Sequence, residues 1–250
     1  MKALVVGDSC IDTYVYGSCD RLCPEGPVPI LKGSERVSTL GMAGNTYNNL
    51  RAFCEEVDFV SNYPQQIVKT RFVDQKTNQL LLRVDIKDTC DRIEPVKREI
   101  EKAYDLVVVS DYCKGFLTDE DLCEIGCSCD LSVIDTKRML TQDIVDCYSF
   151  IKLNRDEYEK NAELLESGSN MSKVIVTLGH KGVRFLDRLY PPPKVLQTFD
   201  VSGAGDVFTA SFSAMLMGGH DPEYCINFAQ QCCHKVIQRK GTCVYKKDMD

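Results

Sequence analysis

Long apolar runs and an excess of positive charge are both missing from this sequence of 250 residues. No stretch approaches the ~20 apolar residues that a membrane-spanning helix needs. The apolar run at residues 3–6 is too short for the core of a signal peptide, and Asp8 interrupts it. The formal net charge of −7 disfavours a nucleic-acid-binding surface. We therefore expect a cytoplasmic protein with neither a membrane nor a nucleic-acid partner.

Paired cysteines at metal-site spacing are also missing, although the sequence contains 14 cysteines. The densest group, Cys123, Cys127 and Cys129, has no second ligand pair at the spacing of a zinc site. The cysteines are scattered through expected strands and helices, where a reduced thiol behaves as a small apolar group. The sequence thus argues against a disulfide framework and against structural zinc.

Apolar strands that alternate with helices dominate the chain from residue 95 onward. The expected strands are 106–109, 131–134, 150–153 and 174–177, and the expected helices are 95–103, 118–126, 155–166, 204–217 and 222–239. This rhythm predicts a central, mainly parallel sheet covered on both faces, which is a three-layer α/β fold. The length fits one domain over residues 1–250.

The amino-terminal part has a different pattern. Residues 13–40 place several Pro and Gly around a short apolar run, which favours short strands and turns over helix. Residues 45–55 suit a helix opened by a glycine-rich turn, and residues 68–85 alternate like a hairpin. We expect segments 13–40 and 68–85 to form a small β lid that closes over a ligand.

The strongest chemical signal is the run Asp-Val-Ser-Gly-Ala-Gly-Asp at residues 200–206, followed by an apolar helix. The backbone N–H groups of Gly203, Ala204 and Gly205 at a helix N-terminus would stabilise a transferring phosphoryl group, and Asp206 would accept the proton of an attacking hydroxyl. A glycine turn with an Asp favoured by the helix dipole explains the same residues. Neither standard nucleotide fingerprint is present, so the residues alone leave both interpretations open.

Five segments together resemble the ribokinase-like (PfkB) carbohydrate kinases. They are residues 41–45, 154–157, 177–182, 200–206 and 241–242. Within that family the sequence is most similar to the kinases of D-glycero-D-manno-heptose 7-phosphate. This second likeness rests on residues 7–14, 24–29, 79–85 and 110–115. It implies phosphorylation of the anomeric hydroxyl by ATP to give a 1,7-bisphosphate, with Asp206 as the base.

The resemblance also implies which residues contact the sugar. Asp12, at the end of the first strand, would accept hydrogen bonds from sugar hydroxyls, and Gly41 and Asn45 would lie against the sugar. Without the resemblance, Asp12 is a capping or turn residue and Asn45 a helix cap. The substrate's own phosphate needs convergent cations, for which the candidates are Arg21, Lys69, Arg71 and Arg83.

On the nucleotide side, Glu157 would organise Mg²⁺ and its waters, with Asn154 close to the phosphates. The other residues that the resemblance assigns to ATP are Thr177, Gly179, Gly182, Asn227 and Gly241. Lys114 and Lys137 would stabilise phosphate charge, although a solvated lysine is an equal alternative for each. A monovalent cation such as K⁺ is a further candidate cofactor.

The chain departs from the family between Cys54 and Val68, where the family has several dozen residues of strand, helix and strand and this chain has about a dozen. A partner subunit would cover a sheet edge exposed by this loss, and a homodimer through the lid is one candidate arrangement. Three alternatives stay open: a kinase of another sugar or nucleoside, a catalytically silent binding homologue, and a dinucleotide-dependent oxidoreductase, which lacks its fingerprint here.

Overall fold

The computed structural model describes residues 1–92, 103–194, 198–239, 241 and 243–246. The helix expected over 95–103 falls almost entirely outside these residues, as does Thr242.

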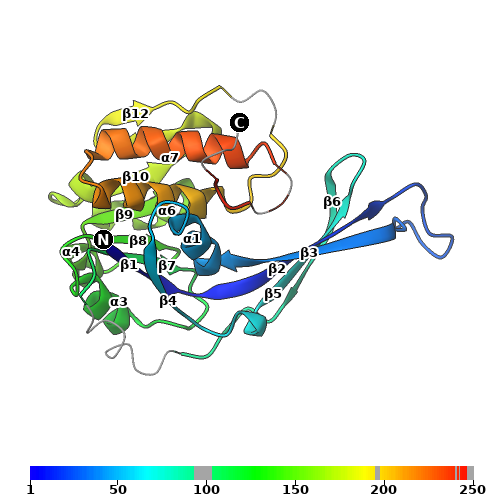
Figure 1. The fold of residues 1–250 in the computed structure, drawn as a ribbon, viewed down its shortest axis with the longest axis horizontal. Coiled ribbons are helices and arrows are strands. Elements are labelled where there is room, and N and C mark those ends of the chain that lie inside the picture. Colours follow the sequence, from blue (N-terminus) through cyan, green and yellow to red (C-terminus); the bar gives the residue numbers. More distant parts are fainter. Residues whose placement is uncertain (93–102, 195–197, 240, 242, 247–250) are drawn as a thin grey trace.

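An eight-stranded sheet forms the centre of the fold (Figure 1). In spatial order its strands are β12 (Arg188–Tyr190), β11 (Val183–Phe185), β10 (Val174–Thr177), β9 (Phe150–Asn154), β8 (Ser132–Thr136), β7 (Leu106–Asp111), β1 (Lys2–Gly7) and β4 (Glu56–Ser61). The strands from β10 to β4 are parallel, whereas β11 and β12 run antiparallel. This confirms the mainly parallel sheet, although the sequence did not predict β4, β11 or β12.

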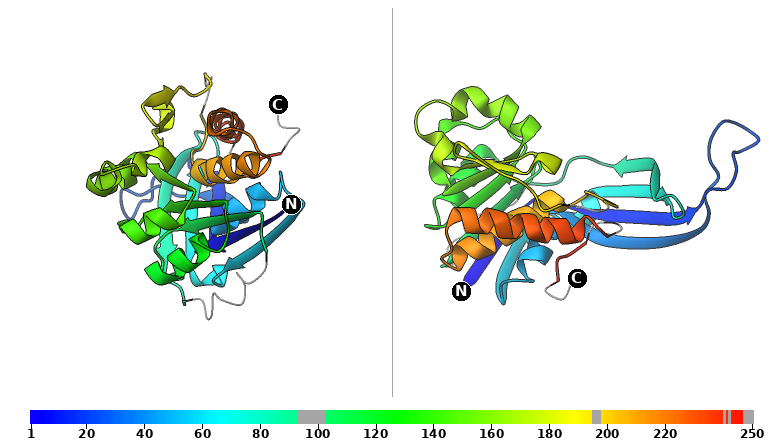
Figure 2. Two further views of the ribbon diagram at one scale, coloured as in Figure 1. Left: turned by 90° about the vertical axis from the view of Figure 1, so that its left-hand side faces the viewer. Right: turned by 90° about the horizontal axis from the view of Figure 1, so that it is seen from above.

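Helices cover both faces of this sheet, so the three-layer fold is confirmed (Figure 2). One face carries α1 (Ala43–Leu50), α6 (Ala204–Met217) and α7 (Pro222–Val236), and the other carries α3 (Asp119–Gly126), α4 (Gln142–Cys147) and α5 (Arg155–Leu165). Successive strand residues point to opposite faces. Leu4 and Val6 therefore pack under α3 to α5, while Ala3 and Val5 pack under α1 and α6.

A second, four-stranded sheet extends away from the first (Figure 1). Its order is β3 (Lys32–Met42), β2 (Ser9–Ser18), β5 (Val68–Asp74) and β6 (Gln79–Ile86). The hairpin expected over 68–85 is confirmed. The expectation of short strands in 13–40 is wrong, because the strands are 10 and 11 residues long. The prolines and Gly26 gather in the connection between β2 and β3, which leaves both flanks free to pair.

The pairing register gives this second sheet two distinct faces, because directly paired residues lie on the same face. We call inner the face that carries Asp12, Tyr14, Tyr16, Thr39, Lys69, Arg71, Arg83 and Asp85. We call outer the face that carries Ile11, Thr13, Val15, Val68, Thr70, Phe72, Leu82, Val84 and Ile86.

The short segment after Cys54 still supplies one strand. β4 pairs in parallel with β1 and forms an edge of the eight-stranded sheet. A single 3₁₀ turn, η1 (Pro64–Gln66), then leads into β5. Two further 3₁₀ turns, η2 (Asn170–Lys173) and η3 (Gly179–Lys181), flank β10. The shortened segment after Cys54 therefore still contributes an edge strand to the large sheet, although the sequence indicated that a strand-helix-strand passage is missing there.

Among the described residues, none of the helices has the length and apolar character needed to cross a membrane. All 14 cysteines are present as free thiols.

Candidate active site

Asp206 lies in the first turn of α6, at the edge of the large sheet where the parallel strands end. Gly203 caps the helix in a left-handed conformation with φ of 79°, which a residue with a side chain rarely adopts. The Ala204 N–H donates to the Val201 carbonyl at 3.2 Å. Within the described residues, the N–H groups of Gly203 and Gly205 have no protein acceptor, so two of the three predicted amides are available to an anion.

Two side chains hold the Asp206 carboxylate. Asn45, in the first turn of α1, donates to Oδ2 at 2.8 Å, and the Tyr112 hydroxyl donates to Oδ1 at 2.7 Å. Burial raises the pKa of Asp206 to about 6, while these two hydrogen bonds to the charged form oppose the rise. A carboxyl group with this pKa is ionised at neutral pH and basic enough to take a proton in a reaction.

A buried ion pair lies directly behind the N-terminus of α6. Lys152 Nζ is 2.8 Å from Asp135 Oδ2, and the Thr209 hydroxyl donates to the same oxygen at 2.9 Å. Gly205 sits against this lysine, since a Cβ built on Gly205 would lie 3.2 Å from Nζ. Burial alone would lower the pKa of Lys152, but the Asp135 carboxylate raises it, so the ammonium stays charged beside the helix N-terminus.

Two further lysines lie close to the Tyr112 ring. Lys137 Nζ is 4.1 Å from the ring centroid and Lys69 Nζ is 5.8 Å from it. Lys69 is buried and its ammonium is 3.3 Å from the Met42 sulfur, and no carboxylate in the described part of the chain is within ion-pair distance of it. Lys137 is accessible to solvent, yet the crowding of its ammonium by protein atoms lowers its pKa.

The sugar-side residues predicted from the sequence lie together, with one exception. Asp12 accepts a hydrogen bond from Arg71 at 2.6 Å, and Gly41 packs so closely that a Cβ would lie 2.5 Å from Asp12 Oδ2. Asp12 lies within β2, not at the end of the first strand, which is followed directly by Asp8. Arg83 is on the same inner face but pairs with Asp85. Arg21 belongs to the connection between β2 and β3. This connection is at the far end of the hairpin, away from the large sheet (Figure 1).

The inner face of the small sheet borders two hollows of about 120 and 280 Å³. Both are lined by Tyr14, Tyr16 and Gly241, and the smaller one also by Arg71 and Asp200. Gly241 has φ of 73°, and a Cβ there would lie 3.0 Å from the Tyr16 hydroxyl. Gly241 therefore packs against the small sheet, and the smaller hollow lies between that sheet and the segment leading into α6.

On the predicted nucleotide side, Asn154 and Glu157 form a capping box at the start of α5. The Asn154 side chain accepts from the Glu157 N–H at 2.9 Å, and the Glu157 carboxylate accepts from the Asn154 N–H at 2.7 Å. The Glu157 carboxyl is buried, which raises its pKa, and Lys137 and Lys152 lie close enough to lower it. The box thus has a structural role, and Glu157 interacts electrostatically with Lys152 and Asp135, as Asp206 does.

The other predicted nucleotide residues divide into open and packed positions. Gly179 has φ of 58°, a Cβ placed there would meet only open space, and it lies just beyond Thr177 at the end of β10. Gly182 has φ of 96°, and a Cβ there would lie 2.1 Å from the Tyr190 carbonyl oxygen, so packing already requires glycine. Asn227 is exposed on α7. Lys114 pairs with Asp88 at 2.5 Å and is therefore already compensated.

Sequence reasoning missed Lys152, Asp135 and the role of Tyr112. Lys152 was detectable in principle, because a lone lysine within the apolar strand residues Phe-Ile-Lys-Leu is an unusual buried charge that requires a partner. The contact of Tyr112 with Asp206 had no local signal, since it joins residues 94 positions apart.

Comparison with known proteins gives matches to a family profile, to curated relatives and to solved structures. A profile of the family described as pfkB family carbohydrate kinase matches residues 114–248, which is more than half of the chain. The bifunctional protein HldE of a Nitratiruptor species is 26% identical over 286 aligned positions that cover 96% of this chain and 62% of the relative. The HldE of Sulfurimonas denitrificans is 28% identical over 295 positions and covers 96% and 61%, respectively.

The chain therefore spans about 62% of the length of these curated relatives. Because 286 aligned positions exceed 250 residues, the relatives also contain segments that this chain lacks, which agrees with a shortened chain. Among solved structures, Escherichia coli phosphofructokinase-2 in complex with substrates and products superposes with a TM-score of 0.75 at 13% identity, covering 99% of this chain and 96% of the other. Arabidopsis thaliana ribokinase complexed with ribose and ATP gives 0.68 at 18% identity, covering 99% and 97%. These two likenesses concern the fold.

Proposed function

Because the chain belongs to the pfkB family of carbohydrate kinases, we propose that it transfers the γ-phosphoryl group of ATP to a sugar hydroxyl, with Asp206 as the general base. The observation that carries this proposal is the buried Asp206 carboxylate, held by Asn45 and Tyr112 beside the two free amides of Gly203 and Gly205. A base and an anion site side by side are what in-line phosphoryl transfer requires.

In the proposed reaction, the sugar hydroxyl gives its proton to Asp206 while its oxygen forms a bond to the γ-phosphorus and the bond to ADP breaks. The amides of Gly203 and Gly205 would lie against the transferring group and stabilise its negative charge. The Lys152 ammonium lies against Gly205, and because Asp135 pairs with it, the two side chains act there as a fixed dipole and not as a free positive charge.

The donor set suits ATP with Mg²⁺. Mg²⁺ keeps most of its waters and takes one or two carboxylates together with phosphate oxygens, and Glu157 offers a carboxylate with one oxygen not used by the capping box. When bound, the ion would neutralise charge on the phosphates. Asn154, Thr177 and Gly179 would lie along the nucleotide, where the space beside Gly179 is open. A K⁺ requirement stays a prediction.

For the substrate we propose D-glycero-D-manno-heptose 7-phosphate, with the anomeric hydroxyl as acceptor. Lys69, Arg71 and Arg83 lie on one face of the small sheet together with Asp12, which supports a site for a phosphorylated sugar. Arg71 and Arg83 already pair with carboxylates, so Lys69 would supply the uncompensated charge. We retain no role for Arg21 within one copy of the chain.

We further propose that residues 1–250 act as one kinase unit in which the small sheet is a lid. Its inner face carries the sugar-side residues, and closure against the segment before α6 would exclude water from the transfer step. We expect this unit to work in the cytoplasm, which cell fractionation would test.

The outer face of the lid supports a homodimer. Leu82, Val84 and Ile86 are 56%, 38% and 57% exposed, and they align across the strands with Val15, Phe72 and Val68. Each of these three residues belongs to a row of paired residues that runs across β6, β5, β2 and β3. The three rows together contain a single charged residue, Arg36. A partner must therefore present an apolar, nearly uncharged face, and a second copy related by a two-fold axis presents one.

The decisive experiment measures ADP production with Mg-ATP over a panel of sugars and sugar phosphates that includes the heptose 7-phosphate. Stimulation by that compound supports the full proposal, and stimulation by another sugar or a nucleoside keeps the kinase and rejects the heptose. ATP binding by folded protein without turnover on any acceptor would identify a catalytically silent homologue.

A further inference from the structure

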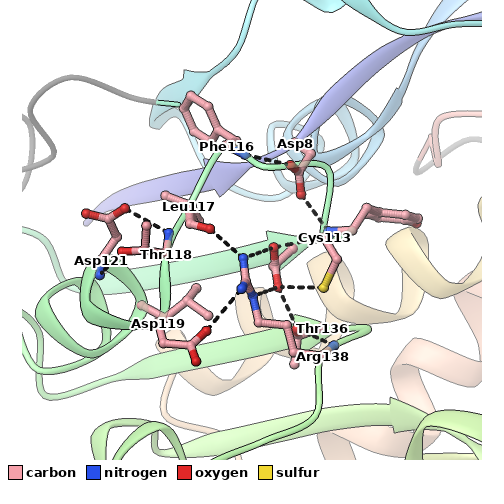
Figure 3. Close-up of polar contacts among 12 residues, drawn as sticks. Asp8, Cys113, Phe116, Leu117, Thr118, Asp119, Asp121, Thr136 and Arg138 are labelled. Carbon is pink, nitrogen blue, oxygen red and sulfur yellow. Dashed lines mark hydrogen bonds and ion pairs between the residues drawn. The ribbon is translucent and has the colours of Figure 1, made fainter. Parts of the chain in front are cut away.

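Asp8 accepts hydrogen bonds from the loop that follows β7. It comes directly after the neighbouring strand β1. One carboxylate oxygen of Asp8 accepts from the Tyr112 N–H at 2.7 Å, and the other accepts from the N–H groups of Lys114 and Phe116 at 3.1 and 3.3 Å. Figure 3 shows Asp8 pointing into the loop between Cys113 and Phe116. A buried carboxylate that accepts three backbone bonds fixes the path of that loop.

The same loop is anchored a second time through Asp111. Arg138 Nε lies 2.7 Å from Asp111 Oδ2, and the Thr136 hydroxyl donates to the same oxygen at 2.6 Å (Figure 3). Between the two anchors the backbone takes positive φ at Cys113 (56°) and Gly115 (100°). Glycine adopts such a value freely, but Cys113 needs outside support to keep it, and the two aspartates supply that support. Residue 112 therefore has one defined backbone position.

From this position the Tyr112 side chain points to the base. Its hydroxyl donates to Asp206 Oδ1 at 2.7 Å, while Asn45 donates to Oδ2 from the other helix. Each carboxylate oxygen thus has its own donor, one from the loop after β7 and one from α1. Two donors on separate elements fix both the position and the plane of a carboxylate, which one donor alone does not do.

We propose that Tyr112 is a positioning residue for the general base and that Asp8 sets its position, an inference that rests on the proposed function of this site. Asp8 orders the backbone of residues 112–116, this backbone places the Tyr112 hydroxyl, and the hydroxyl orients Asp206 with one lone pair directed to the acceptor hydroxyl.

Tyr112 exchanges no proton with the substrate in this scheme, because its own pKa is raised well above its ordinary value by burial and by Asp206. Its hydroxyl therefore stays protonated and remains a donor to the base over the whole range in which Asp206 titrates.

The first test compares Tyr112→Phe with Tyr148→Phe. Tyr148 is a matched control, because its buried hydroxyl also donates one bond of 2.8 Å, but to the Leu122 carbonyl away from the site. Loss of a hydrogen bond to the charged form raises the pKa of Asp206. We expect the acidic limb of the kcat/KM profile to move to higher pH and kcat to fall ~10-fold in Tyr112→Phe, with KM for ATP unchanged. An unmoved limb in Tyr112→Phe, or an equal shift in Tyr148→Phe, would overturn the proposal.

The second test examines the link to Asp8. Asp8→Asn should move the limb in the same direction as Tyr112→Phe, and the double variant should move it no further than Tyr112→Phe alone, since both changes act through one hydrogen bond. Additive shifts would break the proposed link between the two residues.

A third measurement does not depend on finding a substrate. The difference in unfolding free energy between the parent and Asp206→Asn, followed against pH, reports the pKa of Asp206 in the folded state. Repeated in the Tyr112→Phe background, it should give a higher pKa than in the parent. If this shift occurs but no acceptor stimulates ADP release, the hold of Tyr112 on the Asp206 carboxylate is supported and the kinase proposal, with its general base, fails. If the kinase is active but the shift is absent, only the positioning role is rejected.

Discussion

The side-chain amide of Asn45 donates to the carboxylate of Asp206 at 2.8 Å, across 161 residues of sequence. This bond joins the N-termini of α1 and α6, the two helices that pack side by side over the strands β1 and β7. It brings the glycine-rich segment 41–45 and the Gly-Ala-Gly segment 203–205 to one point, so that the sugar side and the phosphoryl side of the proposed site meet at a single carboxylate.

Replacement of the Asp206 carboxylate should lower the turnover rate and leave ATP binding largely unchanged. Asp206→Asn should lower kcat by about 10²–10⁴-fold, because it removes the base and preserves the volume of the side chain. ATP affinity, measured by calorimetry, should change little. The control is Asp143→Asn, which removes the corresponding first-turn aspartate from α4. Turnover by Asp206→Asn at the parent rate would contradict the assigned mechanism.

The same replacement should make the stability of the fold less dependent on pH. The folded-state pKa of Asp206 is about 6, above the ordinary value of 3.8, so the native state binds more protons between these values and loses stability as pH rises through that window. Above pH 6 the loss amounts to about 3 kcal/mol. The stability of Asp206→Asn relative to the parent should therefore be higher at pH 8 than near pH 4, whatever the constant cost of an amide that has one acceptor oxygen for the two donors Asn45 and Tyr112. An equal difference at both pH values would show that burial does not raise this pKa.

Lys69 should discriminate phosphorylated from unphosphorylated sugars. Its buried ammonium has no acidic partner within ion-pair distance in the described part of the chain. Lys69→Met should lower kcat/KM for the sugar phosphate about 10–100-fold, as expected for one charge-assisted hydrogen bond, and should spare ATP. Lys76→Met, in the turn after the same strand, removes an exposed lysine as the control. Equal effects on sugars with and without phosphate would remove Lys69 from the phosphate site.

A charge on the outer face of the lid should disrupt the proposed dimer. Leu82→Asp places a carboxylate among Val15 and Phe72, where a second copy would bury it without a partner. We expect sedimentation to give a monomer for this variant and a dimer for the parent. Leu189→Asp on β12 changes a leucine of similar exposure, 58% against 56%, and should leave the dimer intact. A parent that sediments as a monomer would reject the interface outright.

Two glycines assigned to the nucleotide should respond differently to alanine. Gly182→Ala should destabilise the fold, because the new Cβ would lie 2.1 Å from the Tyr190 carbonyl oxygen. Gly179→Ala has open space, so it should cost only about 1–2 kcal/mol for the positive φ and raise KM for ATP. Melting temperature and ATP KM, measured on both variants, separate the two effects. A stable Gly182→Ala with weakened ATP binding would restore Gly182 to the nucleotide site.

The sequence predicted the parts of the fold that have local signals. The apolar strands, the hairpin over 68–85 and the helix beginning at residue 204 follow from periodicity and glycine placement. The lengths of β2 and β3 did not follow from the sequence, because the prolines in the connection between them favoured short strands and turns over the whole segment. The antiparallel pair β11 and β12 is only three residues per strand, too short for a periodic signal.

Contacts between distant segments were beyond the sequence. The pairing of Arg71 with Asp12 lowers the number of free cations expected near the sugar, and it depends on the parallel register of β2 and β5. The role of Asp8 as an acceptor for the loop after β7 depends on the adjacency of β1 and β7, although Asp8 and Tyr112 are 104 positions apart in the sequence. Such relations follow from topology, which a single sequence does not contain.

The order of the site residues along the chain also determines when the site forms during synthesis. Asn45 and Tyr112 leave the ribosome long before Asp206, and until α6 arrives their polar groups lack the acceptor that they share in the finished protein. The strands β1 and β7 likewise lack the helix that covers them beside α1. A nascent chain that ends before residue 204 therefore exposes apolar strands and orphaned donors together. We therefore expect a chain that ends before residue 204 to be degraded by proteases, since it lacks both Asp206 and the helix that covers β1 and β7.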